Sequence, residues 1–230
     1  MSGYWEQHED LLAALAADDL AHDDGAVAPT LLVLDDDDAG VLVRARRPRH
    51  HDRSDPLSEL AAFVAARQPP RVVLAVAGDV QSVAGPGLGR GLACSSAQWS
   101  QGRWQHRLRI LTDPFSDADG PGGRFDADVA GSPLGALLDD ALRHPANLDA
   151  WTTLSVLAGL GHLVHVSEET VVPDDVPDPE QLTDQQVRQV RRVAIELGRR
   201  TAPRSASGAR RRLPTPLTDV PPGWQAACPL

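Results

Sequence analysis

The sequence predicts an α+β fold, a two-layer domain in which helices cover a mostly antiparallel sheet of about five strands. Apolar residues recur every three or four positions over residues 5–20, which is typical of an amphipathic helix. Alternating or continuous apolar runs at residues 30–47 and 71–80 are typical of strands. Helices and strands do not alternate regularly along the chain, which argues against a doubly wound parallel sheet.

Each expected element has its own local signal. Residues 30–47 are expected to form a hairpin around the turn residues Asp37–Gly40. A helix opens with Pro56, capped by Asp55 or Ser54, and ends before the prolines at 69 and 70. The remaining expected elements are strands at 90–99, 102–112 and 163–166, helices at 132–143 and 148–160 with Asn147 as the cap of the second, and a long loop at 113–131.

Residues 71–80 are the best candidate for a central strand. The run from Val72 to Ala77 contains no charged residue, so neither face of this strand is suited to water. We therefore expect the strand to be buried on both faces.

The composition divides the chain into four parts. Residues 1–167 form the globular domain, and residues 168–181 form an acidic, proline-rich linker. Residues 182–200 form an amphipathic helix. Residues 201–230 are rich in arginine, proline and small polar residues, and we expect this tail to be disordered.

The overall composition indicates a globular, acidic protein. Apolar residues make up 42% of the 230 residues, and the net charge is −10. All 22 basic residues are arginine, a bias typical of GC-rich genomes, so their number alone is no sign of nucleic-acid binding.

Two cysteines, Cys94 and Cys228, are too few for a disulfide framework and favour a reducing compartment. With no signal peptide or membrane-spanning run in view, the expected location is the cytoplasm.

The arginines are concentrated towards the C-terminus. Residues 188–212 contain nine arginines and one acid, a net charge of +8, which leaves −18 for the rest of a chain whose total is −10. The helix at their start is predicted to begin with a capping box at Thr183 and Gln186. Its apolar stripe consists of Val187, Val190, Ala194 and Leu197. The predicted partner-binding residues are Arg188, Arg191, Arg192, Arg199, Arg200, Arg204, Arg210, Arg211 and Arg212.

Two interpretations of these arginines stay open. They bind an acidic partner, which is either a protein surface or the phosphates of a nucleic acid, or they neutralise the acidic body of their own chain. No aromatic residue lies among them between Arg199 and Arg212, so base stacking is not expected. The apolar stripe of the helix is expected to dock either on the chain's own domain or on another chain.

A metal site is the main alternative source of chemistry. Asp35–Asp38 lie in the predicted hairpin, and His50 and His51 follow its second strand. Mixed histidine and aspartate sites bind divalent metals, but the spacing fits no EF-hand loop. His162 and His165 lack the helical HExxH pattern, and in a strand they would point to opposite faces. We therefore predict no metal and no cofactor.

Two further motifs fail as catalytic signatures. The glycine-rich run Gly85–Gly91 matches neither a phosphate-binding loop, which needs a lysine, nor the dinucleotide fingerprint. Cys94 and His106 lie on neighbouring predicted strands and could form a nucleophile pair across a hairpin. No elbow motif surrounds either of them.

The sequence therefore favours a non-enzymatic interaction or accessory protein that meets an acidic partner through residues 182–212. The alternative is a metal-dependent or thiol-dependent hydrolase with a site near Asp35–Asp38, His50 and His51.

Overall fold

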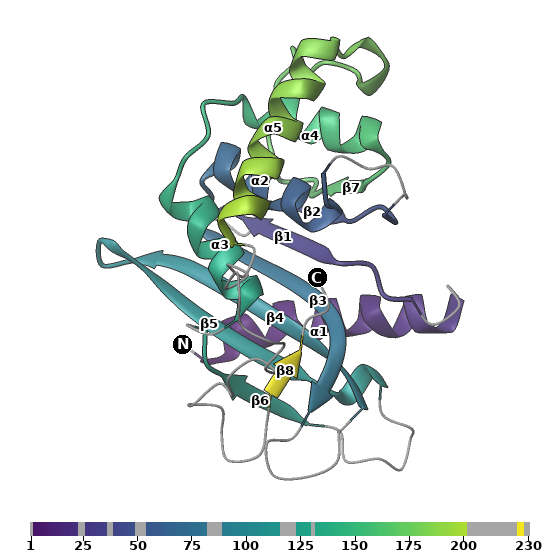
Figure 1. Cartoon of the computed structure of the whole chain (residues 1–230), viewed down its shortest axis with the longest axis vertical. Coiled ribbons are helices and arrows are strands. Elements are labelled where there is room, and N and C mark those ends of the chain that lie inside the picture. Colours follow the sequence, from purple (N-terminus) through teal and green to yellow (C-terminus); the bar gives the residue numbers. More distant parts are fainter. Residues whose placement is uncertain are drawn as a thin grey trace, which may run out of the picture.

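The computed structural model describes residues 2–22, 26–35, 39–48, 54–81, 89–115, 123–129, 132–201 and 225–227. In this part of the chain five α-helices accompany an antiparallel sheet with the strand order β6-β5-β4-β3-β1-β2-β7, which confirms the α+β class (Figure 1). The helices are α1 (Ser2–His22), α2 (Pro56–Arg67), α3 (Pro133–Arg143), α4 (Ala150–Leu160) and α5 (Asp184–Thr201). The strands are β1 (Thr30–Leu34), β2 (Gly40–Arg44), β3 (Arg71–Gln81), β4 (Gly89–Ser100), β5 (Arg103–Leu111), β6 (Arg124–Ala127) and β7 (Leu163–Val166), and β8 (Gln225–Ala227) pairs with the end of β3.

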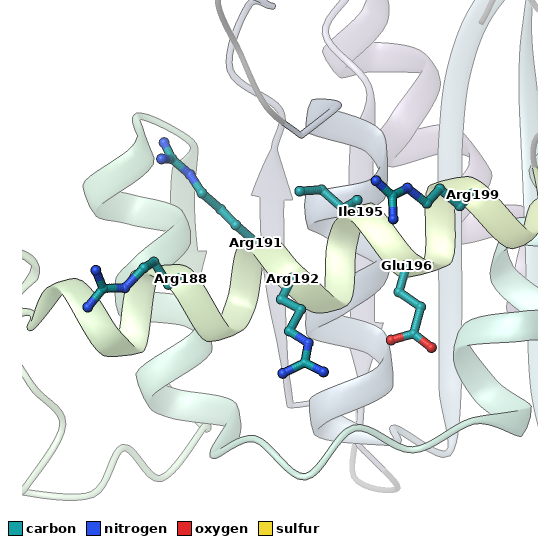
Figure 2. Close-up of a pocket in the computed structure, with 6 residues that line it drawn as sticks. All are labelled: Arg188, Arg191, Arg192, Ile195, Glu196 and Arg199. Atoms are coloured by element: carbon teal, nitrogen blue, oxygen red, sulfur yellow. The ribbon is translucent and has the colours of Figure 1, made fainter.

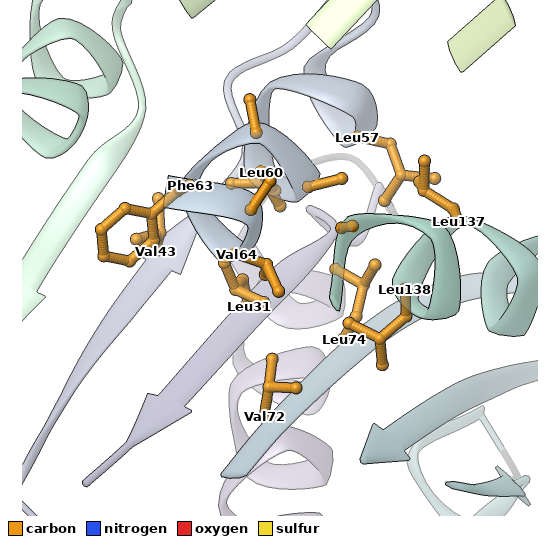
Figure 3. Packing of buried hydrophobic residues seen from close by; sticks show 14 of the residues in the cluster. Leu31, Val43, Leu57, Leu60, Phe63, Val64, Val72, Leu74, Leu137 and Leu138 are labelled. Carbon is orange, nitrogen blue, oxygen red and sulfur yellow. The ribbon is translucent and has the colours of Figure 1, made fainter. Parts of the chain in front are cut away.

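The sheet is covered on both faces, so the domain has three layers instead of the two expected. Helix α1 packs on one face through Leu12 and Ala16. Helices α2 to α5 lie on the other face, where the larger core is formed (Figure 1). Figure 3 shows Leu60, Phe63 and Val64 of α2 packed towards the strands in this core. The sequence pattern identified α1 as amphipathic but contained no signal for the face of the sheet that it covers.

Strand β3 lies in the middle of the sheet, as predicted. It pairs with β1 on one side and with β4 on the other. Val72, Leu74 and Val76 belong to the core beneath α2, whereas Val73 and Ala75 belong to the core beneath α1. Both faces are therefore buried over Val72–Val76, because each face meets its own helical layer.

Two local predictions need correction. The segment 113–131 contains strand β6, which pairs with β5 so that Phe125 lies opposite Ile110. Its alternating sequence Arg-Phe-Asp-Ala is short and lies among glycines and aspartates, so the strand depends on its pairing with β5. The cap of α4 is Asp149 and not Asn147, since the Asp149 carboxylate accepts a 2.6 Å hydrogen bond from the Thr152 N–H. By contrast, Asp55 caps α2 as expected, and Ser132 caps α3.

Helix α5 completes the larger core from outside. Val190, Ala194 and Leu197 are buried, and the helix packs against α2, α3 and α4. At Gly198 a β-carbon would come within 2.8 Å of the Ser58 hydroxyl of α2, so the missing side chain permits this close approach. The predicted stripe of α5 therefore docks on the chain's own domain.

Candidate functional site

The start of α5 is held by the predicted capping box. The Gln186 side chain accepts a 2.8 Å hydrogen bond from the Thr183 N–H, and the Gln186 N–H donates to the Thr183 hydroxyl at 3.3 Å. The helix is thus set by its own cap and by its docked apolar side. Its outer side faces away from the domain.

Four arginines occupy that outer side. Arg188, Arg191, Arg192 and Arg199 repeat at helical spacing, opposite the buried Val190, Ala194 and Leu197. Ile195, which is partly buried, lies among them. We call these four arginines and Ile195 the arginine stripe.

The arginine stripe borders a shallow concave surface. Together with Glu196 it lines an open hollow of about 760 Å³. Figure 2 shows Arg191, Ile195 and Arg199 along one edge of the helix and Arg192 and Glu196 along the other. A side chain of a partner that entered this hollow would meet several guanidinium groups and one aliphatic surface.

The charges of the stripe are not neutralised by the described part of the chain. Arg188, Arg191, Arg192 and Arg199 form no ion pair there. The Nε atom of Arg191 is buried and has no hydrogen-bond partner. Arg200 is different, because it pairs with Glu196 and lies 3.7 Å from Asp140 of α3. Arg200 therefore fastens α5 to its neighbour and is not part of the stripe.

Several predicted site residues lie outside the described residues. They are Arg204, Arg210, Arg211 and Arg212 of the tail, Asp36–Asp38, His50, His51, and Gly85–Leu88.

Of the proposed aspartate cluster only Asp35 is described. Arg67 donates to both of its carboxylate oxygens at 2.8 Å, which ties α2 to the end of β1. Within the described ranges no group of three metal-ligating side chains occurs.

His162 and His165 have unrelated environments, because only His165 lies in a strand. His165 is exposed on β7, whereas His162 is buried in the turn that precedes this strand. The Nδ1 atom of His162 accepts from the Arg46 N–H at 3.4 Å, and its Nε2 atom donates to Glu59 at 2.8 Å. His162 is therefore a hydrogen-bonded core residue.

Glu59 is the centre of a buried polar network that sequence reasoning missed. Its carboxylate accepts from Arg46 at 2.9 and 3.1 Å, from His162, and from the Ser54 hydroxyl at 2.5 Å. Burial alone would raise the pKa of Glu59, but these hydrogen bonds and the charge of Arg46 outweigh it and hold the pKa below the ordinary value of 4.5. The sequence contained no signal for this network, because Glu59 falls on the side of the predicted helix opposite Leu57, Ala61 and Val64.

The network serves structure and not catalysis. Glu59 and His162 have no exposed side-chain surface, so no substrate reaches them in this conformation. The carboxylate already accepts four hydrogen bonds, which leaves it no capacity for a proton-transfer partner. It connects the chain after β2, the start of α2 and the turn before β7.

Cys94 and His106 do not form a pair. Cys94 lies opposite Arg109 in the β4–β5 register, and His106 lies opposite Ala97. Cys94 belongs to the core beneath α1, whereas Ala97 belongs to the core beneath α2, so the thiol and the imidazole are on opposite faces of the sheet. Burial raises the pKa of the Cys94 thiol far above its ordinary range, and the charge of Glu9 raises it further. Burial lowers the pKa of His106, partly offset by Asp139, so neither group has the character of an activated nucleophile–base pair.

Comparison with known proteins adds no assignment, since no family model, no curated protein and no solved structure matches the chain. Among the described helices, none has the length and apolar character needed to cross a membrane.

Proposed function

We propose that this chain is a non-enzymatic interaction protein whose arginine stripe binds an acidic segment of a protein partner. The observation that carries the proposal is the set of four outward-facing arginines on a docked helix, with no ion pair in the described residues. Leaving four charges unpaired on a fixed surface favours an anionic ligand, because partner binding then requires little rearrangement of the stripe.

A protein partner fits the stripe better than a nucleic acid. Ile195 lies among the arginines, and Glu196 borders them. Phosphates gain nothing from an aliphatic contact, whereas an acidic peptide with apolar side chains can use Ile195.

The test compares an acidic peptide with DNA. Fluorescence anisotropy measures binding of a labelled peptide of glutamates and valines and of a short labelled duplex to the full chain, at low and high salt. We expect the peptide to bind more tightly and the binding to weaken as salt screens the charges. Preferred binding of the duplex would replace the protein partner by a nucleic acid.

Matched variants locate the binding surface. Replacing the exposed Arg188 and Arg192 by alanine is expected to weaken peptide binding on the order of tenfold. The control replaces Arg103 and Arg143, which are exposed on β5 and α3 and give the same change in charge. Equal weakening in both double variants would mean that only net charge matters and would refute the stripe as the site.

A further inference from the structure

A second surface of the same chain has the opposite chemistry. Residues 168–175, which we call the acidic segment, contain Glu168, Glu169, Asp174 and Asp175, all exposed. None of these four acids forms an ion pair in the described part of the chain. Val171, at 87% exposure, is the most exposed large apolar residue described, and Val172 is 45% exposed. Such a combination of free charge and exposed aliphatic surface is typical of a contact site.

The neighbouring strand also exposes apolar side chains. Leu163 and Val166 of β7 are 59% and 37% exposed, so four of the six exposed large apolar residues in the described chain lie between positions 163 and 172. β7 is also an edge strand of the sheet. Four of these side chains therefore lie in this one stretch of chain, with Leu163 and Val166 on opposite faces of β7.

The acidic segment is held in place at its start. The Ser167 N–H and the Thr170 hydroxyl donate to the Gly40 carbonyl at 2.9 and 3.2 Å. The Ser167 hydroxyl accepts from the Gly40 N–H at 3.0 Å. A segment anchored in this way loses little conformational entropy on binding.

The acidic segment and the arginine stripe are complementary in charge, order and length. In the segment, two pairs of acids flank two valines, and in the stripe Arg191, Arg192 and Arg199 flank Ile195. Arg188 and Arg199, the ends of the stripe, are eleven positions apart, roughly 16 Å along the helix. The two acid pairs are six residues apart, at most about 20 Å when extended, and turns at 168–169 and 174–175 shorten this span.

We infer that the acidic partner of the arginine stripe is the acidic segment of a second copy of this chain. The inference rests on the proposed function, because it names the partner of the same stripe. Within one chain the two surfaces form no ion pair, and each is fastened to the domain, one by the docking of α5 and the other by Gly40. Each copy carries both surfaces, so a two-fold dimer forms the contact twice.

The first measurement is the mass of the full chain in solution by light scattering. A dimer that dissociates as salt rises is expected, with a dissociation constant that increases on the order of tenfold from low to high salt. A chain that stays monomeric at high micromolar concentration and low salt would overturn the inference.

Charge reversal with rescue by mixing identifies the two surfaces. One variant carries Arg188→Glu and Arg192→Glu, and the other carries Glu168→Arg and Glu169→Arg; all four positions are exposed. Each variant alone brings like charges together at both contacts and is expected to be monomeric. In the mixture both contacts again join opposite charges, so a heterodimer forms, which native mass spectrometry detects by its mass. Rescue by mixing also shows that both variants are folded.

The outcomes separate this inference from the proposed function. If the wild-type chain is monomeric but its stripe still binds the peptide of glutamates and valines, the inference fails and the proposed function stands. If neither the dimer nor peptide binding is found, both fail. A dimer that persists in either charge-reversed variant alone forms through another surface and also refutes the inference.

Discussion

The Nε2 atom of His162 lies 2.8 Å from a carboxylate oxygen of Glu59, although the two residues are 103 positions apart and neither side chain is exposed. With Arg46 and Ser54, this contact joins three segments that lie far apart in the sequence. Folding removes all of these polar groups from water. The network therefore stabilises the folded protein only when each group has its hydrogen-bond partners.

Replacing Glu59 by glutamine is expected to lower the free energy of unfolding by about 3 kcal/mol, because the change removes the carboxylate opposite Arg46 and turns an amide donor towards other donors. Urea denaturation followed by circular dichroism measures the effect. The control is Glu180→Gln at an exposed position, which should change stability by less than about 0.5 kcal/mol. Equal stability of the two variants would contradict a structural role for the network.

The same carboxylate makes stability depend on pH. The pKa of Glu59 in the folded protein lies below its ordinary value of 4.5, so the unfolded chain takes up the proton more readily. The contribution of Glu59 is therefore complete well above pH 4.5 and is lost as the pH falls through the folded-state pKa. Urea midpoints of the wild type and of Glu59→Gln should differ at neutral pH and converge in acid. A constant difference at every pH would show that the charge of Glu59 does not matter.

Cys94 is expected to be unreactive in the folded protein, because its thiol is 1% exposed and burial raises its pKa. The measurement uses Ellman's reagent on a Cys228→Ser variant, in which Cys94 is the remaining cysteine. No thiol should react in native buffer, and one equivalent should react after unfolding in urea. Rapid reaction of the native protein would mean that the sheet opens at β4 far more easily than its burial indicates.

The docking of α5 predicts unequal effects at two neighbouring positions. Leu197, at 3% exposure, packs into the core beneath α2, so Leu197→Ala should cost about 2–4 kcal/mol of stability. Ile195→Ala, in the arginine stripe, removes a partly buried side chain and should cost less than about 1.5 kcal/mol. Urea unfolding of both variants makes the comparison. Similar losses at both positions would contradict the orientation of α5.

The central position of β3 makes it intolerant of charge. Val73→Asp places a carboxylate between β3 and α1, where no side-chain surface is exposed, and should prevent folding because a buried unpaired charge costs several kcal/mol. The same substitution at Val171, which is 87% exposed, is the control and should leave the circular dichroism spectrum unchanged. A folded Val73→Asp protein would refute the burial of this strand.

Several features of this protein could be predicted from short stretches of sequence, because they depend on contacts within a few residues. The caps of α2, α3 and α5 are hydrogen bonds over three positions. The uncharged run of β3 and the heptad-like stripe of α5 each show which faces avoid water. For this reason the α+β class, the central strand and the outward arginines of α5 were predicted correctly.

Other features depend on which distant segments meet, and local patterns contain no record of that. Glu59 looks like an ordinary helical residue until Arg46 and His162 approach it from other segments. Strand β6 becomes a strand by pairing with β5, and α1 covers the second face of the sheet through residues that would fit either face.

The separation of Cys94 from His106 has the same origin. The β4–β5 register places Trp99 opposite Trp104, and from there the alternation of the pleat puts the thiol and the imidazole on opposite faces. Periodicity shows which side chains of a segment share a face, but the pairing of segments depends on packing over the whole chain. That packing directed the apolar stripe of α5 inward and its arginines outward.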